Sequence, residues 1–392
     1  MKIAFFTDTF LPQVNGIATA LANQASELGK QGHSVIIFTP KLDDIKRGKY
    51  SAKNVTVVHL PTVPASLYPE FKLGIFGLPR VIRHLTRFKP DLIHLHTPFT
   101  VGMDAVMASK VFKKPLVGTV HTYFTDSDYL GWLRYKLAIK LVANVAERYQ
   151  NFLFNQCDLV LSPSKILAEN LNKDGFKKPI SYLPNGVTLI APKILAEKEK
   201  SGIKKKYHLK EKVILHFGRL SYEINVDLLI KAFRIINKKN NNVSLLIIGD
   251  GPAKKNLIKL VKKSGLEKQV IFTGFIDHQV LLSEGILSVG DIFATASTME
   301  NNPMAVLEAM IYGAPIVGVN QAGLIELVSS NGFLVEPGNI KSLAEKMEQI
   351  LFDEELSKKM SQKSLETIKD YSIDKTVNKL LNMYQKITSK TV

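Results

Sequence analysis

Two carboxylates, Glu300 and Glu308, are spaced so that both could face one ligand. Glu300 ends a loop that follows the apolar run 292–295, and Pro303 suits the first turn of the helix that comes next. Glu308 then lies one to two turns into that helix. Carboxylates at these points can accept hydrogen bonds from sugar or ribose hydroxyls, while the helix N-terminus would face an anionic group of the same ligand. The alternative is a pair of surface acids without a ligand.

A cation and a histidine each follow directly on a predicted strand. Arg219 comes after the run 213–217, and its fork of donors could reach a diphosphate or form a surface ion pair. His121 comes after the run 116–120, where it either points toward a cleft or caps the strand. Both residues are therefore candidates for a site at the carboxyl ends of the strands.

A glycine and two further histidines complete the set of candidates. Gly16 ends a loop just before a predicted helix, where a backbone can approach an anion closely, but the full G-x-G-x-x-G fingerprint is missing, and an ordinary turn is the alternative. His94 and His96 share one face of a strand. Since no third ligand has supporting spacing, we expect buried, hydrogen-bonded histidines rather than a metal pair, and we predict no metal site.

The elements that must position these residues form two series of short apolar runs, typical of buried parallel strands. The first series lies at 2–7, 34–38, 55–60, 92–96, 116–120 and 159–162. The second follows a lysine-rich linker at 193–212 and lies at 213–217, 243–248, 270–273, 292–295 and 315–319. Helical patterns separate the runs, and the amphipathic stretch 372–388 predicts a C-terminal helix. The sequence thus predicts an α/β protein with two Rossmann-like domains facing a cleft.

Composition sets the protein class. The chain has 392 residues, of which 45% are hydrophobic, so intrinsic disorder is excluded as the main state. Cys157 is the single cysteine, which rules out an internal disulfide and favours a reducing, cytoplasmic setting. No apolar run approaches the ~20 residues of a membrane-spanning helix. The net charge of +17 would attract anionic lipid or phosphorylated ligands, or it reflects a general richness in lysine that keeps the protein soluble. Without a DNA- or RNA-binding signature we expect no nucleic-acid partner.

Taken in order, the motifs of this chain resemble glycosyltransferase family 4. The segments that carry the resemblance are 7–17, 94–99, 120–123, 162–164, 184–187, 218–220, 249–252, the Glu300/Glu308 pair, and 308–310 followed by 313–315. The resemblance covers nearly the whole chain. It implies a retaining enzyme of the GT-B fold, with an acceptor-binding domain at 1–187, a nucleotide-sugar-binding domain at 188–371, and a crossover helix at 372–392 that packs on the first domain.

The resemblance also implies roles for the candidate residues. Glu308 would bind ribose hydroxyls, and Glu300 would hold the donor sugar together with the backbone of Asn301, Asn302, Pro303 and Met304. Arg219 would neutralise the diphosphate, and the Gly16 backbone would approach it. His121 would contact the sugar near the reacting carbon. The nucleotide sugar would be the substrate, and neither a metal ion nor another cofactor is expected.

Three positions depart from the family pattern. Ile224 stands five residues after Arg219, where the family usually has a lysine, and an aliphatic side chain cannot neutralise a diphosphate. Thr188 replaces an aspartate, and Pro303 replaces a glycine found in many members. These departures leave open a weakly active or non-catalytic relative that binds nucleotide sugars.

The first half of the chain would choose the acceptor. Arg80, Arg83 and Arg87 share one helix face, next to the apolar stretch 71–78, which suits an anionic membrane surface, although a solvated charged helix would show the same pattern. Four residues are candidates on the acceptor side: Tyr123, Asp126, Tyr129 and Trp132.

The segment 121–130 is similar to that of diacylglycerol glucosyltransferases. We therefore expect the enzyme to transfer a hexose to a membrane glycerolipid such as diacylglycerol. The expected hexose is glucose, and the expected donor is UDP-glucose. The protein would then associate peripherally with the inner face of the plasma membrane. A soluble or polysaccharide acceptor is the alternative.

Overall fold

The computed structural model describes residues 1–13, 15–41, 50–64, 72–75, 77–121, 136–173, 176–189, 195–321 and 323–389. The chain divides into two units. Unit 1 comprises Met1–Gly186 together with Ile373–Val392, and unit 2 comprises Val187–Ser372. The end of the chain therefore folds with its first half.

A seven-stranded parallel sheet forms the centre of unit 1, in the order β3-β2-β1-β6-β7-β8-β9. Its strands are β1 (Lys2–Phe6), β2 (Ser34–Pro40), β3 (Val55–Leu60), β6 (Leu92–Leu95), β7 (Leu116–Thr119), β8 (Leu159–Ser162) and β9 (Ile180–Tyr182). A separate antiparallel pair joins β4 (Thr62–Pro64) and β5 (Lys72–Gly74). The inner strands are almost wholly apolar because helices cover both faces of the sheet.

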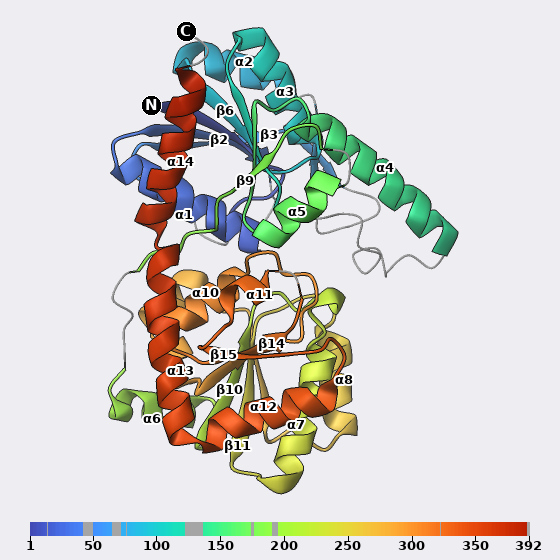
Figure 1. Ribbon diagram of the computed structural model, residues 1–392, viewed down its shortest axis with the longest axis vertical. Coiled ribbons are helices and arrows are strands. Elements are labelled where there is room, and N and C mark those ends of the chain that lie inside the picture. Colours follow the sequence, from blue (N-terminus) through green and yellow to red (C-terminus); the bar gives the residue numbers. More distant parts are fainter. Residues whose placement is uncertain are drawn as a thin grey trace. The chain divides into compact units, whose positions relative to one another are not determined.

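Helices on the two faces of this sheet enclose two hydrophobic cores. They are α1 (Gly16–Lys30), α2 (Gly77–Phe88), α3 (Thr100–Phe112), α4 (Lys136–Phe154), α5 (Lys165–Lys173) and α14 (Ile373–Thr388). Alternate residues of β1 point to opposite faces. Ile3 and Phe5 pack with α1 and α14, whereas Ala4 and Phe6 pack with α2 and α3. Figure 1 shows α14 lying alongside α1.

The spacing of apolar residues in α14 explains why the C-terminal segment joins unit 1. Val377, Leu380, Leu381 and Tyr384 fall on one helix face and are all buried in the core that α1 also lines. The helix begins and ends within the stretch that the sequence predicts to be helical.

Unit 2 contains a six-stranded parallel sheet in the order β12-β11-β10-β13-β14-β15. Its strands are β10 (Lys212–Phe217), β11 (Val243–Ile248), β12 (Val270–Gly274), β13 (Ile292–Ala294), β14 (Ile316–Val319) and β15 (Gly332–Val335). Its helices are α6 (Glu197–Lys206), α7 (Val226–Lys239), α8 (Lys254–Lys263), α9 (His278–Ser283), α10 (Met304–Ile311), α11 (Leu324–Leu327), α12 (Ile340–Phe352) and α13 (Glu354–Thr367). The 3₁₀ turns are η2 (Tyr222–Ile224), η3 (Ile286–Val289) and η4 (Ile368–Tyr371).

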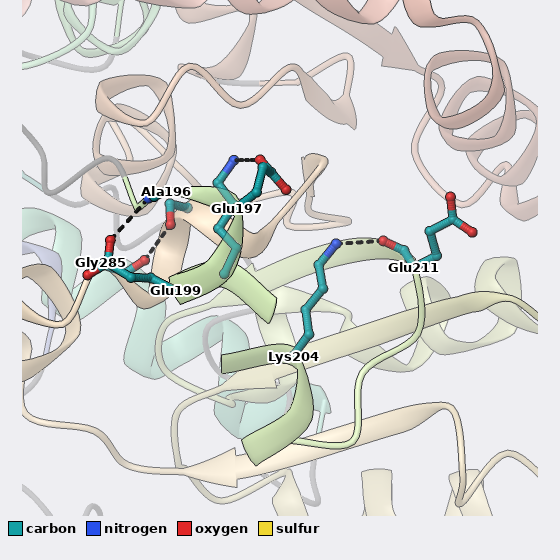
Figure 2. Close-up of polar contacts among 8 residues, drawn as sticks. Ala196, Glu197, Glu199, Lys204, Glu211 and Gly285 are labelled. Atoms are coloured by element: carbon teal, nitrogen blue, oxygen red, sulfur yellow. Dashed lines mark hydrogen bonds and ion pairs between the residues drawn. The ribbon is translucent and has the colours of Figure 1, made fainter. Parts of the chain in front are cut away.

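The lysine-rich segment that the sequence analysis interprets as a linker contains a helix, α6. Its first turn carries two glutamates and its last turn three lysines, which matches the helix dipole. Figure 2 shows how its ends are held: the Glu199 carboxylate accepts a hydrogen bond from the Ala196 N–H at 3.1 Å, and Lys204 Nζ donates to the Glu211 carbonyl at 2.7 Å. Local charge and capping therefore stabilise a helix that has no buried residue.

Each sheet has one point at which the strand order reverses direction. In unit 1 this point lies between β1 and β6, and in unit 2 it lies between β10 and β13. Ligands of open α/β sheets bind outside the carboxyl ends of the strands at such a point. The loops that follow these four strands are therefore the places to look for a site.

Candidate functional site

Arg219 lies in the loop after β10, and the neighbouring loop fixes the backbone around it. A Cβ added to Gly249 would lie 1.9 Å from the Gly218 carbonyl oxygen, and one added to Gly251 would lie 2.4 Å from the Leu220 carbonyl oxygen. Only glycine allows so close a backbone approach. The loop after β11 thus holds the chain on both sides of the half-buried Arg219.

Glu300 lies in the loop after β13, where its surroundings disfavour the ionised form of its carboxyl. Burial, and then the negative charge of Glu223, raise the pKa of this carboxyl to about 7, although a hydrogen bond with Ser297 acts in the opposite direction. The Gly323 N–H donates to the Glu300 carbonyl at 2.7 Å. A Cβ on Gly323 would lie 1.7 Å from the Asn301 carbonyl oxygen, so this residue must be glycine for the loop to adopt its conformation.

The switch point of unit 2 brings the Arg219 and Glu300 loops together. Strands β10 and β13 are hydrogen-bonded neighbours, so their carboxyl ends lie side by side. Asn225 Nδ2 donates to the Ala296 carbonyl at 3.4 Å, which links the two loops. Ile224, in the position of the usual lysine, is half-buried in η2. The fold therefore gathers an arginine and a carboxylate of raised pKa where a ligand is expected.

Glu308 lies on α10, whose N-terminus is buried. Pro303 precedes the first helical residue, Met304, and both are buried together with Asn302. The Glu308 side chain is 8% exposed, and its Oε1 lies 2.8 Å from Nε2 of His278. The sequence analysis does not identify His278, which is remote in sequence and meets Glu308 only through the fold.

His121 follows β7 in unit 1 and lies in a group of buried histidines. Its Nε2 is 3.3 Å from Nδ1 of His96. Burial lowers the pKa of His121 to about 4, so the imidazole is neutral at neutral pH. His96 and His121 line a pocket of unit 1 with Thr119, Gln24 and Asn185. A neutral imidazole at the wall of this pocket can donate or accept a hydrogen bond but supplies no fixed charge.

His94 is tied to the C-terminal helix, as expected for a buried, hydrogen-bonded histidine. Its Nδ1 lies 2.5 Å from the Tyr384 hydroxyl, and its Nε2 lies 2.8 Å from the Thr119 hydroxyl. Its ring centroid is 3.9 Å from that of His96. Within the part of the chain that the structure describes, no group of three or more His, Cys, Asp or Glu residues could hold a metal ion.

Tyr384→Phe should destabilise unit 1, because it leaves Nδ1 of the buried His94 without its hydroxyl partner. We expect the free energy of unfolding to fall by about 1–3 kcal/mol, the cost of an unsatisfied buried polar group. Urea denaturation followed by circular dichroism measures this change. Tyr222→Phe is the control, since Tyr222 is 57% exposed, and equal effects of the two substitutions would contradict the assignment.

The loop after β1 contains the Gly16 candidate and a buried aspartate. Gly16 is exposed at the start of α1, where Asn15 Oδ1 accepts a hydrogen bond from the Ala18 N–H at 2.9 Å. Asp8 Oδ1 accepts from the Val101 N–H at 3.0 Å and so ties β1 to the N-terminus of α3. Burial raises the pKa of Asp8 to about 6, despite its hydrogen bonds.

On α2, basic and apolar residues occupy different faces. Arg80, Arg83 and Arg87 are exposed, whereas Val81 and Leu85 are buried in the core. The apolar side of this helix therefore faces the protein, and only its cationic side is open to a partner. None of the helices in the described residues is both long and apolar enough to cross a membrane.

Some predicted residues lie outside the described part of the chain. These are the four acceptor-side candidates Tyr123, Asp126, Tyr129 and Trp132, and also Phe71 and Phe76 of the apolar stretch beside α2. Ile75 and Leu78 of that stretch are described and are half-buried. Cys157 is buried, as expected for a structural cysteine.

Two family profiles together match most of the chain. The family described as glycosyl transferases group 1 matches residues 197–367, and the one described as glycosyltransferase family 4 matches residues 14–189. The chain is also 30% identical over 340 residues to an alpha-monoglucosyldiacylglycerol synthase of Streptococcus pneumoniae, with 85% of this chain and 74% of that protein covered. A protein of the same name from Acholeplasma laidlawii is 26% identical, with 81% and 80% covered.

Solved structures share the fold over nearly the whole chain. Sucrose-phosphate synthase from Thermosynechococcus elongatus superposes with a TM-score of 0.81 at 18% identity, covering 99% of each chain. Anabaena HepE in complex with UDP-glucose gives a TM-score of 0.77 at 20% identity, covering 98% of this chain and 100% of the other. With its two parallel-sheet α/β units and these relatives, the chain belongs to glycosyltransferase family 4 and is a hexosyltransferase with the GT-B fold.

Proposed function

We propose that this enzyme transfers glucose from UDP-glucose to a hydroxyl group of diacylglycerol, with retention of the α configuration. The observation that carries the proposal is the similarity to the two alpha-monoglucosyldiacylglycerol synthases, which extends over 85% and 81% of the chain. UDP-glucose is an α-glycoside, so an α-linked product requires retention at the anomeric carbon.

Unit 2 would bind the donor at its switch point. Arg219 would offer its guanidinium fork to the diphosphate, whose negative charge grows as the bond to the sugar breaks. The Glu300 carboxylate and the backbone of 301–304 would hold the glucose hydroxyls, and Glu308 would accept hydrogen bonds from the ribose. The adjacency of the β10 and β13 loops supports this assignment.

Unit 1 would supply His121 and the acceptor site. A neutral His121 can hydrogen-bond a sugar hydroxyl near the reacting carbon without placing a positive charge beside the oxocarbenium-like centre. The Gly16 backbone would approach the diphosphate, because the N-terminus of a helix attracts anions. The four acceptor-side candidates stay part of the proposal, as does catalysis without a metal ion.

The test of this function is a transfer assay with the purified protein and labelled UDP-glucose. Diacylglycerol in anionic micelles is compared with soluble sugars and polysaccharides as acceptors. We expect a labelled glucolipid and an unchanged rate in EDTA. Transfer only to a soluble or polysaccharide acceptor would refute the lipid assignment, and donor binding without transfer or hydrolysis would indicate a non-catalytic relative.

The cationic face of α2 would bring the enzyme to the lipid. Burial lowers the pKa of His84 on this helix, and the positive charges of the three arginines Arg80, Arg83 and Arg87 lower it further. Each arginine near an anionic bilayer contributes about 1 kcal/mol of attraction. We therefore propose a peripheral association through this helix face.

Replacing Arg83 and Arg87 with glutamine should weaken sedimentation with anionic vesicles by roughly thirtyfold, the effect of about 2 kcal/mol. The matched control replaces Lys259 and Lys263 of α8, which are also exposed and one turn apart. The control should bind almost as well as the wild type. An equal loss in both variants would show that total charge, rather than α2, attracts the membrane.

A further inference from the structure

His278 is the first residue of α9, and it makes the closest ionic contact of Glu308 that the structure gives. The His278 Nε2 and Glu308 Oε1 atoms are 2.8 Å apart, within the range of a charge-assisted hydrogen bond. The Glu308 side chain is 8% exposed, whereas that of His278 is 41% exposed. The pair therefore joins a nearly buried carboxylate on α10 to an imidazole that reaches the surface.

The surroundings of this pair favour the charged form of His278. Burial lowers the pKa of His278, but the hydrogen bond and charge of Glu308, together with the charge of Asp277, outweigh burial and raise it overall. Burial and the negative charge of Glu308 also raise the pKa of Tyr312, the C-cap residue of α10. A buried carboxylate without a cationic partner would tend to take up a proton instead.

An ionised carboxylate fixed by one oxygen is well suited to recognise hydroxyl groups. Two oxygens give it about four acceptor positions, and His278 occupies one on Oε1. Oε2 then stays available to accept from a ligand, and the side chain loses little further freedom when it does so. A protonated Glu308 would offer one hydroxyl donor and fewer acceptors, and would bind a diol less well.

We propose that His278 is a positioning residue for ribose recognition: it holds the Glu308 carboxylate so that the enzyme selects a nucleotide whose ribose carries free hydroxyls. The inference rests on the proposed function, because it takes the ribose-binding role of Glu308 from there. His278 is not expected to touch the reacting atoms. A purely structural ion pair between α9 and α10 would instead affect stability and leave nucleotide selectivity unchanged.

The experiment measures the affinity of the full-length protein for UDP and for 2′,3′-dideoxy-UDP by isothermal titration calorimetry. His278→Ala should weaken the binding of UDP about tenfold and leave the binding of the dideoxy compound unchanged, because only UDP has the ribose hydroxyls that Glu308 would bind. His278→Gln should retain most of the UDP affinity, since its amide can still donate to Glu308. Gln279→Ala, an exposed neighbour on α9, should match the wild type.

Two results would overturn the inference. His278→Ala could lose affinity for both nucleotides equally, or it could lose affinity for neither. If the alanine variant does not fold, the glutamine variant decides, because loss of both nucleotides there would equally contradict a positioning role. Glu308→Ala separates this inference from the proposed function. If it leaves the preference for UDP intact, the ribose role of Glu308 is wrong. If it abolishes the preference while His278→Ala keeps it, only the role of His278 is wrong.

Discussion

Replacing Arg219 with alanine is expected to lower kcat for glucosyl transfer by about 10²–10³-fold, the usual effect of removing one preorganised donor to a developing negative charge. In the proposed site, one feature of unit 2 would make the enzyme depend on the arginine. Ile224 provides no charge where the family usually has a lysine. Steady-state kinetics with saturating UDP-glucose measures the effect.

Arg219→Lys is the matched variant, because it keeps the charge but loses the bidentate fork. We expect it to recover only part of the activity. An unchanged melting temperature in both variants would separate a chemical defect from a folding defect. An alanine variant with wild-type kcat and KM would remove Arg219 from the diphosphate site.

Glu300→Gln is expected to lower kcat/KM about 10²-fold and to change its pH dependence, because in the proposed donor site the carboxylate would accept hydrogen bonds from the sugar. The pKa of Glu300 is raised to about 7, so the group loses its proton as the pH rises through neutrality. In the wild type, kcat/KM should therefore rise with pH, with a midpoint near 7, since this parameter reports the free enzyme. The glutamine variant should lack that rise.

Glu223→Gln tests whether the negative charge of Glu223 contributes to the raised pKa of Glu300. Removing the like charge next to Glu300 should lower the pKa of that carboxyl and move the midpoint of the rise to lower pH. A profile that is identical in the wild type and both variants would show that another group governs the pH dependence.

The strands buried on both faces could be predicted because their sequences are short, continuous apolar runs. β11 coincides with its predicted run, and β10 starts one residue earlier than its run. The sequence does not predict β9 and β15, at the edges of the two parallel sheets, or the antiparallel pair β4 and β5. β15 begins with Gly332, and a glycine at the start of a run weakens its strand signal. The fold requires a glycine there, because a Cβ would lie 1.9 Å from the Ile316 carbonyl oxygen. β9 has only three residues, all half-buried.

The candidate site could be predicted only in part, because a sequence shows which loops follow the strands but not which side chains pair across them. The topology places the loops of Arg219 and Glu300 next to each other, as strand order at a switch point requires. The hydrogen bond between His278 and Glu308 joins residues 30 positions apart in the sequence, and no local pattern predicts it. The same holds for His94 and Tyr384, which are 290 residues apart in the sequence.

A crystal structure of this enzyme with UDP-glucose would test the central claim most directly. We expect the diphosphate within hydrogen-bond distance of the Arg219 guanidinium, the ribose on Glu308 and the glucose on Glu300. A well-ordered nucleotide sugar bound elsewhere, with these three side chains out of its reach, would contradict the account.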